Sequence, residues 1–265
     1  MKVFLDRDQR PGRDNETIVI GTRLVLHLAI ATTAVSSALS AQNSGDGFLF
    51  GKPQGSIVLR GGYSLAAANS DLFSFTARQL TLNKRDFSSP VGDIDLAVTL
   101  APRTDVVLAA SYAGMTKGSE FRDFVDQSDN PIQQTTTFQR VPVTIGVREY
   151  LMSRGRTVGS FAWIPARFAP YIGAGAGMTW YRFRQQGDLV DFNTNEVFTA
   201  MLESTGWTPA ATATVGAEYT VSPRVALTAQ GNYLWARGNP NGDFSGFNRI
   251  DLSGVSATAG LLVRF

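Results

Sequence analysis

Several residue types on which enzymes and disulfide-rich proteins depend are missing or scarce in this chain. It has no cysteine among its 265 residues, which excludes disulfide bonds, a thiolate nucleophile and a cysteine-based metal site. Its single histidine is His27. Charged residues make up 17% of the chain, against about 25% in a typical soluble protein. The composition therefore points away from an ordinary soluble enzyme.

Long apolar runs are also absent beyond residue 41. No stretch there approaches the roughly 18 to 20 consecutive apolar residues that a membrane helix needs. The mean hydropathy of -0.04 instead reflects apolar and polar residues that are finely interleaved. The formal net charge of only +2 gives no argument for nucleic-acid binding, and we expect no nucleic-acid partner.

The N-terminal region has the pattern of an export signal. Residues 24–35 form an apolar core of signal-peptide length, which Arg23 precedes and a run of small residues follows. We expect residues 1–41 to be a signal peptide that is removed by cleavage after Ala41. Cleavage after Ser40 is an alternative, because small residues then occupy the positions that signal peptidase prefers.

An uncleaved anchor over residues 18–35 is a second alternative, although it would bury Arg23 and His27 in the membrane. Cleavage, in contrast, leaves a mature chain without histidine. The catalytic arrangements that use histidine as general base are then unavailable. We therefore expect no enzyme activity, no catalytic residue and no cofactor.

What the chain does have is alternation of apolar and polar residues in eight separate segments, with turn residues between them. Such alternation over about 8 to 12 residues is typical of strands that face lipid on one side and a lumen on the other. The sequence therefore predicts an all-β fold, an eight-stranded antiparallel up-and-down transmembrane β-barrel that occupies residues 42–265. The predicted strands are 56–63, 92–101, 106–113, 138–151, 170–183, 210–221, 225–236 and 251–265.

The polar face of these strands carries charge. In the segment 92–101, Asp93 and Asp95 alternate with aliphatic residues that would face lipid. An eight-stranded barrel is just wide enough for side chains to fill it, so we expect the inward charges to pair as a network that closes the lumen. A role in conduction or ligand binding is the alternative. The predicted lumen network comprises Arg60, Asp93, Asp95, Arg140, Arg148 and Glu218, and Arg264 also points inward.

The connections between the predicted strands alternate in length. Those at 102–105 and 221–224 are short, and that at 152–169 is intermediate. Short periplasmic turns and long outer loops are the expected asymmetry of such barrels. One of the long connections contains apolar residues whose spacing predicts a short amphipathic helix from Asn193 to Ser204. The long connections lie near 64–91, 114–137, 184–209 and 237–250.

Aromatic residues gather at the ends of the predicted strands. Amphipathic rings prefer the level of the lipid headgroups, so the pattern predicts an aromatic girdle at both membrane interfaces. The residues concerned are Tyr63, Tyr112, Tyr150, Tyr171, Tyr181, Tyr219, Tyr233, Trp180, Trp207 and Trp235.

Two weaker patterns suggest a ligand. The glycine-rich run after Tyr171 lacks the following helix with lysine that a phosphate loop needs. Asp123, Asp126, Asp129 and Asn130 invite a calcium site, but their spacing lacks the glycine and terminal glutamate of an EF-hand. Acidic surface loops are usually solvated, so we expect no metal site.

The terminal segment SATAGLLVRF, the run PYIGAGAGMTWY and the AQ junction after the signal resemble small outer-membrane barrels of the OmpA-transmembrane-domain-like and OmpW-like kind. The resemblance implies the outer membrane of a Gram-negative-type, diderm bacterium, with outer-membrane lipid and lipopolysaccharide as partners. It also implies that Phe265 is an assembly signal read by the barrel assembly machinery. We also expect no carboxy-terminal cell-wall domain like that of full-length relatives, because the last predicted strand ends at Phe265.

The leading functional hypothesis is a structural or surface-interaction role without catalysis. The alternative is a narrow channel or binding barrel for small hydrophobic molecules, since the outer loops contain apolar residues such as Phe73 and Met201 that could form an entry site. A secreted lipocalin-like barrel is a third possibility. It is opposed by the apolar outward faces of the predicted strands, where a soluble barrel should be polar.

Overall fold

The computed structural model describes residues 47–126, 128–191 and 196–265. The predicted signal peptide, residues 1–41, lies outside these residues. Among the residues described, no helix is long and apolar enough to cross a membrane.

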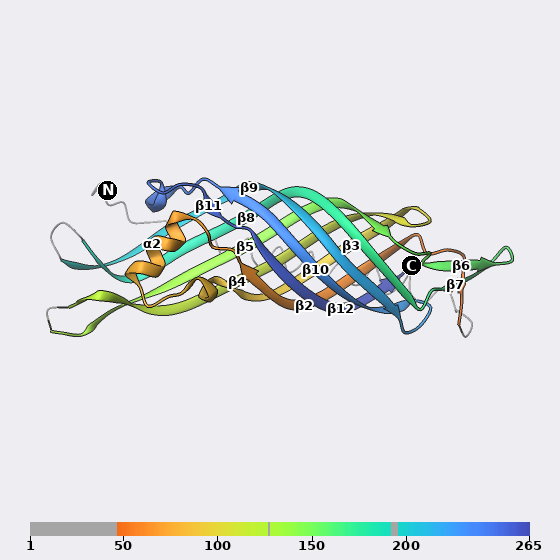
Figure 1. Cartoon of the computed structure of the whole chain (residues 1–265), viewed down its shortest axis with the longest axis horizontal. Coiled ribbons are helices and arrows are strands. Elements are labelled where there is room, and N and C mark those ends of the chain that lie inside the picture. Colours follow the sequence, from red (N-terminus) through yellow and green to blue (C-terminus); the bar gives the residue numbers. More distant parts are fainter. Residues whose placement is uncertain (1–46, 127, 192–195) are drawn as a thin grey trace, which may run out of the picture. The chain divides into compact units, whose positions relative to one another are not determined.

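Eight long strands form a closed ring, in which each strand pairs antiparallel with the next along the barrel wall (Figure 1). The last strand pairs with the first from Gly254↔Ala66 to Arg264↔Ser56, so the ring has no free edge along this stretch. The predicted eight-stranded up-and-down barrel is therefore confirmed. The strands are β2 Gly55–Ala66, β3 Ser89–Ala101, β4 Thr104–Val125, β5 Pro131–Tyr150, β8 Phe168–Val190, β9 Val197–Thr220, β10 Val225–Gly238 and β12 Gly254–Arg264.

The sequence alternation decides which side chains face inward. On β3, Val98 is 63% exposed on the outside of the barrel, whereas Asp95 and Ala97 are each only 2% exposed inside it. Successive strand residues point to opposite faces, so a register slip of one residue would bring the carboxylates to the lipid side. The pattern therefore fixes the register of the whole ring.

Four strands are far longer than the alternation predicted. The hairpins β4–β5 and β8–β9 continue through most of the segments predicted as the long loops 114–137 and 184–209. The predicted helix over 193–204 is wrong, because its part from Val197 onward belongs to β9 and pairs with β8. Asn193 lies outside the described residues. Cross-strand pairing therefore overrides the local helical spacing.

Shorter elements close the two ends of the ring. The helix α2 Asp71–Gln79 and the 3₁₀ turn η1 Lys84–Phe87 follow β2, and η2 Gly242–Phe244 and β11 Ile250–Asp251 follow β10. We call this the outer end, since the long connections meet there. The opposite, inner end carries a separate three-stranded sheet of β1 Leu49–Phe50, β6 Gly155–Val158 and β7 Ala162–Pro165 (Figure 1).

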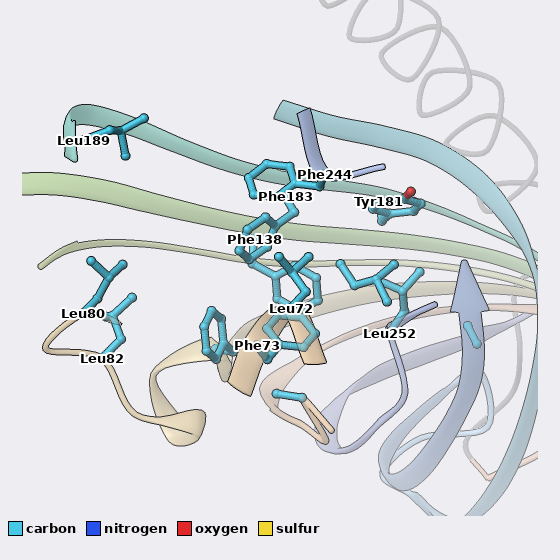
Figure 2. Packing of buried hydrophobic residues seen from close by; sticks show 14 of the residues in the cluster. Leu72, Phe73, Leu80, Leu82, Phe138, Tyr181, Phe183, Leu189, Phe244 and Leu252 are labelled. Atoms are coloured by element: carbon cyan, nitrogen blue, oxygen red, sulfur yellow. The ribbon is translucent and has the colours of Figure 1, made fainter. Parts of the chain in front are cut away.

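A large apolar cluster fills the outer end of the barrel (Figure 2). The Phe73 ring of α2 lies 5.1 Å from that of Phe138 on β5 and 5.7 Å from that of Phe183 on β8, in edge-to-face geometry. We call this set the outer cluster. It includes Leu72, Phe73, Leu80, Leu82, Phe87, Phe121, Ile132, Phe138, Tyr181, Phe183, Leu189, Phe244, Ile250 and Leu252.

Candidate functional site

The candidate site is the barrel interior between the outer cluster and the inner end. Inward positions of β2, β3, β5, β9 and β12 place charged side chains there, and the outward face of each strand is mostly apolar in the middle of the barrel. A buried charge is costly unless it is paired and hydrogen-bonded. The partners of each charge therefore show what the site can do.

The first group of charges forms a chain across the lumen. The guanidinium of Arg60 on β2 contacts Asp93 at 2.8 Å and Asp95 at 2.6 Å, both on β3. Asp95 also accepts a hydrogen bond of 2.5 Å from Arg148 on β5. The Arg148 guanidinium in turn lies 4.5 Å from the centre of the Tyr171 ring on β8. Asp95 thus joins two arginines from different strands, and the chain reaches across to β8.

The second group lies closer to the inner end. Glu218 on β9 accepts a 2.9 Å hydrogen bond from Arg264 on β12 and a 2.5 Å hydrogen bond from the hydroxyl of Tyr150 on β5. Arg264 also donates to the hydroxyl of Thr220. These contacts link strands on opposite sides of the ring.

Arg140 belongs to neither group. Its guanidinium donates to the carbonyl oxygens of Leu252 at 2.8 Å and Ser253 at 3.2 Å, and to the hydroxyl of Ser64 at 2.9 Å. It therefore anchors the segment between β11 and β12 to the wall of the barrel. The ion pairs of the predicted residues thus lie in two groups. Arg60, Asp93, Asp95 and Arg148 form one, and Glu218 and Arg264 form the other.

A further ion pair at the inner end was not predicted from the sequence. Asp105, placed in a predicted turn, is buried and contacts Arg154 at 2.8 Å. Arg154 comes from the connection that leads to β6, and its guanidinium lies 4.7 Å from the centre of the Tyr150 ring. Asp105 and Arg154 are 49 positions apart, so no local sequence pattern predicts their contact. They meet because the connection before β6 folds back to the end of the barrel.

Three of the tyrosines assigned to the girdle are instead interior residues. Tyr150, Tyr171 and Tyr181 are each 1% exposed. Their hydroxyls donate inside the barrel, that of Tyr171 to Gln230 at 2.9 Å and that of Tyr181 to the carbonyl of Asn239 at 2.9 Å. The girdle prediction is wrong for these three because alternation, and not nearness to a strand end, sets their side. The sequence signal that predicts the inward side is that each tyrosine lies two residues from another inward-facing position on its strand.

The remaining girdle positions do face outward. Tyr63, Tyr112, Trp207, Tyr233 and Trp235 are about half exposed towards the outer end. Phe168, Tyr219 and Phe265 are similarly exposed towards the inner end. Aliphatic side chains fill the band between them, as in a barrel that crosses a membrane. This band includes Leu59, Ile94, Leu96, Val98, Leu108, Ile145, Ile172, Val215, Leu227 and Leu261.

The acidic residues after β4 have a structural role. Asp126 accepts hydrogen bonds from the backbone amides of Ser128 at 2.7 Å and Asn130 at 2.8 Å. These bonds hold the pKa of Asp126 below its usual range and close the turn of the hairpin. Among the described residues, no group of three or more His, Cys, Asp or Glu side chains is placed to hold a metal ion.

Cavities in the interior are small. One of about 50 Å³ lies beside Arg60, Asp93 and Thr144, which is room for very few water molecules. A second of about 260 Å³ lies at the inner end beside Tyr150, Arg154 and Trp163. The interior carboxylates Asp93, Asp95, Asp105 and Glu218 each have an arginine partner, and these ion pairs tie strands and connections together.

Comparison with known proteins gave matches among solved structures alone. No protein-family model matches the chain, and no curated protein matches it. Three similar solved structures are the outer membrane protein OprG from Pseudomonas aeruginosa, Neisserial surface protein A and the attachment invasion locus protein of Yersinia pestis.

OprG shares 15% identity over 81% of this chain and 98% of its own, with a TM-score of 0.45. The Neisserial protein shares 13% identity over 84% of this chain and 100% of its own, with a TM-score of 0.41. The Yersinia protein shares 12% identity over 80% of this chain and 99% of its own, with a TM-score of 0.40. The closed ring rests on this chain's own strand pairing, and by that ring the chain is similar to small outer-membrane barrels, as the alternation and motifs indicated.

Proposed function

We propose that this protein is an integral outer-membrane barrel with a closed lumen and a structural or surface-interaction role, without catalysis. One observation carries the proposal. The chain of ion pairs from Arg60 through Asp95 to Arg148 lies inside the barrel where its outside is aliphatic. Lipid on one side and paired charge on the other are what a sealed transmembrane barrel needs.

The outer end supports closure as well. Leu72 and Phe73 of α2 are fully buried in the outer cluster, and so are Leu80 and Leu82. These residues were among the apolar loop residues expected to form an entry site for a hydrophobic molecule. Because they pack against the barrel wall, a channel would require α2 to leave the lumen.

The surface role rests on the long hairpins. β4–β5 and β8–β9 extend well past the outer aromatic residues Tyr112 and Trp180, so they stand outside the lipid. A plain membrane anchor does not need such extensions. A non-catalytic role fits the lumen charges, where Asp93, Asp95 and Glu218 are each engaged by an arginine.

Fractionation and conductance test the proposal together. The full chain, expressed in a diderm host, should appear in the outer-membrane fraction and migrate faster on a gel before heating than after. In a planar bilayer the purified barrel should show no discrete conductance steps. Recovery as a soluble periplasmic protein would contradict the membrane location. Regular conductance steps would favour the narrow channel instead.

Phe265 belongs to the same proposal. Its amide donates to the carbonyl of Gly55 at 3.0 Å, its carbonyl accepts from Gln54 at 2.8 Å, and its ring is 57% exposed on the lipid side. We propose that the barrel assembly machinery recognises this exposed ring at the seam of the barrel.

Phe265→Ser should therefore lower the yield of heat-modifiable barrel in the outer membrane several-fold while leaving the urea stability of the folded fraction nearly unchanged. Leu261→Ser, on the same face of β12, is the control and should retain assembly. Equal yields of the two variants would show that Phe265 has no special part in assembly.

A further inference from the structure

The outward face of β5, β8 and β9 is arranged in regular rows beyond the lipid band. Strand pairing places Val141, Trp180 and Trp207 side by side in one row. The next outward-facing row, two residues further along each strand, is Gln139, Arg182 and Thr205. The row after that is Thr137, Arg184 and Glu203. We call these two the arginine rows.

The tryptophan row fixes the level of these arginines in the membrane. Indole rings settle at the headgroup level of a bilayer. Two strand residues advance about 6.7 Å, which is about 5 Å along the membrane normal for a strand tilted by about 40°. Arg182 and Arg184 therefore lie at and just above the level where lipid phosphates are found.

Charge is left over in these rows. Both arginines face the single carboxylate of Glu203, Arg184 at 2.5 Å and Arg182 at 3.5 Å. The Arg182 guanidinium also lies 5.3 Å from the centre of the Trp180 ring. About 30% of each arginine side chain remains exposed. The two cations share one anion, so these three side chains carry a net charge of +1 and present forked donors that suit a phosphate. The carboxylate of Asp243 accepts a hydrogen bond from the backbone amide of Glu203.

A polar groove continues outward from the arginine rows. The next outward row contains Thr135 and Gln186, which line a surface cavity of about 590 Å³. Gly118, Gly187, Glu120 and Gln133 line the same cavity, together with Thr81 and the buried Ser119 and Gln134. Amide, hydroxyl and carboxylate groups over exposed backbone suit the hydroxyl groups of a sugar.

We propose that this face binds a phosphorylated glycolipid of the outer leaflet. Its phosphate would contact Arg182 and Arg184, its acyl chains would lie along Trp180, Trp207 and the aliphatic band below, and its sugars would reach the polar groove. The proposal rests on the outer-membrane location proposed above. It goes further by naming the residues that hold the lipid.

Binding to the folded barrel in nanodiscs of zwitterionic phospholipid tests the site. The probes are lipid A with two phosphates, the same lipid after removal of its phosphates, and free inorganic phosphate. Wild type should bind the phosphorylated lipid at least about tenfold more tightly than either other probe. The double variant Arg182→Gln/Arg184→Gln should lose that preference, whereas Arg85→Gln, an exposed arginine in η1, should keep it.

Glu203→Gln separates a lipid site from a purely structural ion pair. Removing the competing carboxylate should strengthen binding of phosphorylated lipid several-fold, although it removes a cross-strand contact. If the ion pairs were purely structural, the substitutions of Arg182, Arg184 and Glu203 should lower the free energy of unfolding and leave lipid binding unchanged. The proposed site would be overturned if the folded double variant kept its preference for phosphorylated lipid. Weaker binding of phosphorylated lipid by Glu203→Gln would also overturn it. Failure of the outer-membrane location is a separate result, because fractionation and heat-modified migration detect it in wild type.

Discussion

Asp95 is the residue on which the interior depends most. It is 2% exposed and is held at 2.6 Å by Arg60 and at 2.5 Å by Arg148. Without this carboxylate Arg148 loses its ion-pair partner, and Arg60 keeps only Asp93. Removal of one partner from a buried group of charges costs more than the interaction itself, because the remaining charge stays buried.

Asp95→Ala should therefore lower the free energy of unfolding by about 3 to 5 kcal/mol, measured by urea titration of the barrel in lipid vesicles. Asp123→Ala, an exposed aspartate of β4, is the control and should change it by less than about 0.5 kcal/mol. A loss below about 1 kcal/mol for Asp95→Ala would mean that water or other groups compensate the two arginines.

Asp86 in η1 gives a pH-dependent contact outside the membrane. The Lys117 ammonium at 2.5 Å and the backbone amide of Asn83 hold the pKa of Asp86 below its ordinary value. Since the pKa of the folded state lies below that of the unfolded state, the contact contributes fully above the ordinary aspartate range. It is lost as pH falls through the lowered pKa.

We expect the amides of η1 to lose hydrogen-exchange protection, corrected for intrinsic rates, below about pH 3.8, with amides of the lipid-facing strands unaffected. Lys117 is 46% exposed, so the contribution is about 1 kcal/mol or less. Asp86→Asn should show the same local loss already at neutral pH. Protection that is unchanged in this variant would show that the ion pair does not hold η1.

At the scale of elements, α2 closes the outer end although nothing in the strand pattern predicts it. Asp71–Gln79 was treated as part of a long connection, and its Leu72, Phe73 and Thr76 are buried. The nine residues are too few for a stable isolated helix. The helix therefore forms because Phe73 packs against Phe87, Phe138 and Phe183.

Phe73→Ala should destabilise the packed position of α2 by about 3 to 5 kcal/mol, because the truncation leaves a cavity among aromatic rings. Protease should then cut the segment between β2 and β3 faster, while the eight strands stay resistant. Arg78→Ala, on the exposed side of α2, is the control and should be cut at the wild-type rate. Cleavage equal to wild type in Phe73→Ala would mean that the outer cluster does not hold the helix.

For the whole molecule, lipid exposure of the aliphatic band is the central expectation. Ile94 lies in the middle of β3 and Leu100 near its inner end, and both point outward. Ile94→Arg should cost about 2 to 4 kcal/mol in the free energy of unfolding in vesicles, and Leu100→Arg at most about 1 kcal/mol. The two variants carry the same charge on the same strand, so their difference reports membrane depth alone. Equal costs would contradict a bilayer around the band.

The sequence by itself determined the number of barrel strands, their order and the side to which most of their residues point. It could do so because the side chains of a strand have a period of two. The alternation is therefore visible in adjacent residues such as Ile94, Asp95 and Leu96. The same alternation identified the inward charges. It also predicts an inward position for Tyr150, but the argument from strand ends placed this residue in the girdle.

Only the tertiary structure decided which charges meet. Asp95 and Arg148 are 53 positions apart, and Arg140 turns to the carbonyls of Leu252 and Ser253 over a separation of more than 110. Pairing inside a barrel depends on the stagger between strands across the lumen, which no local pattern records. The continuation of β9 into the predicted helix has the same cause. Cross-strand hydrogen bonds with β8 outweigh the local preference of those residues.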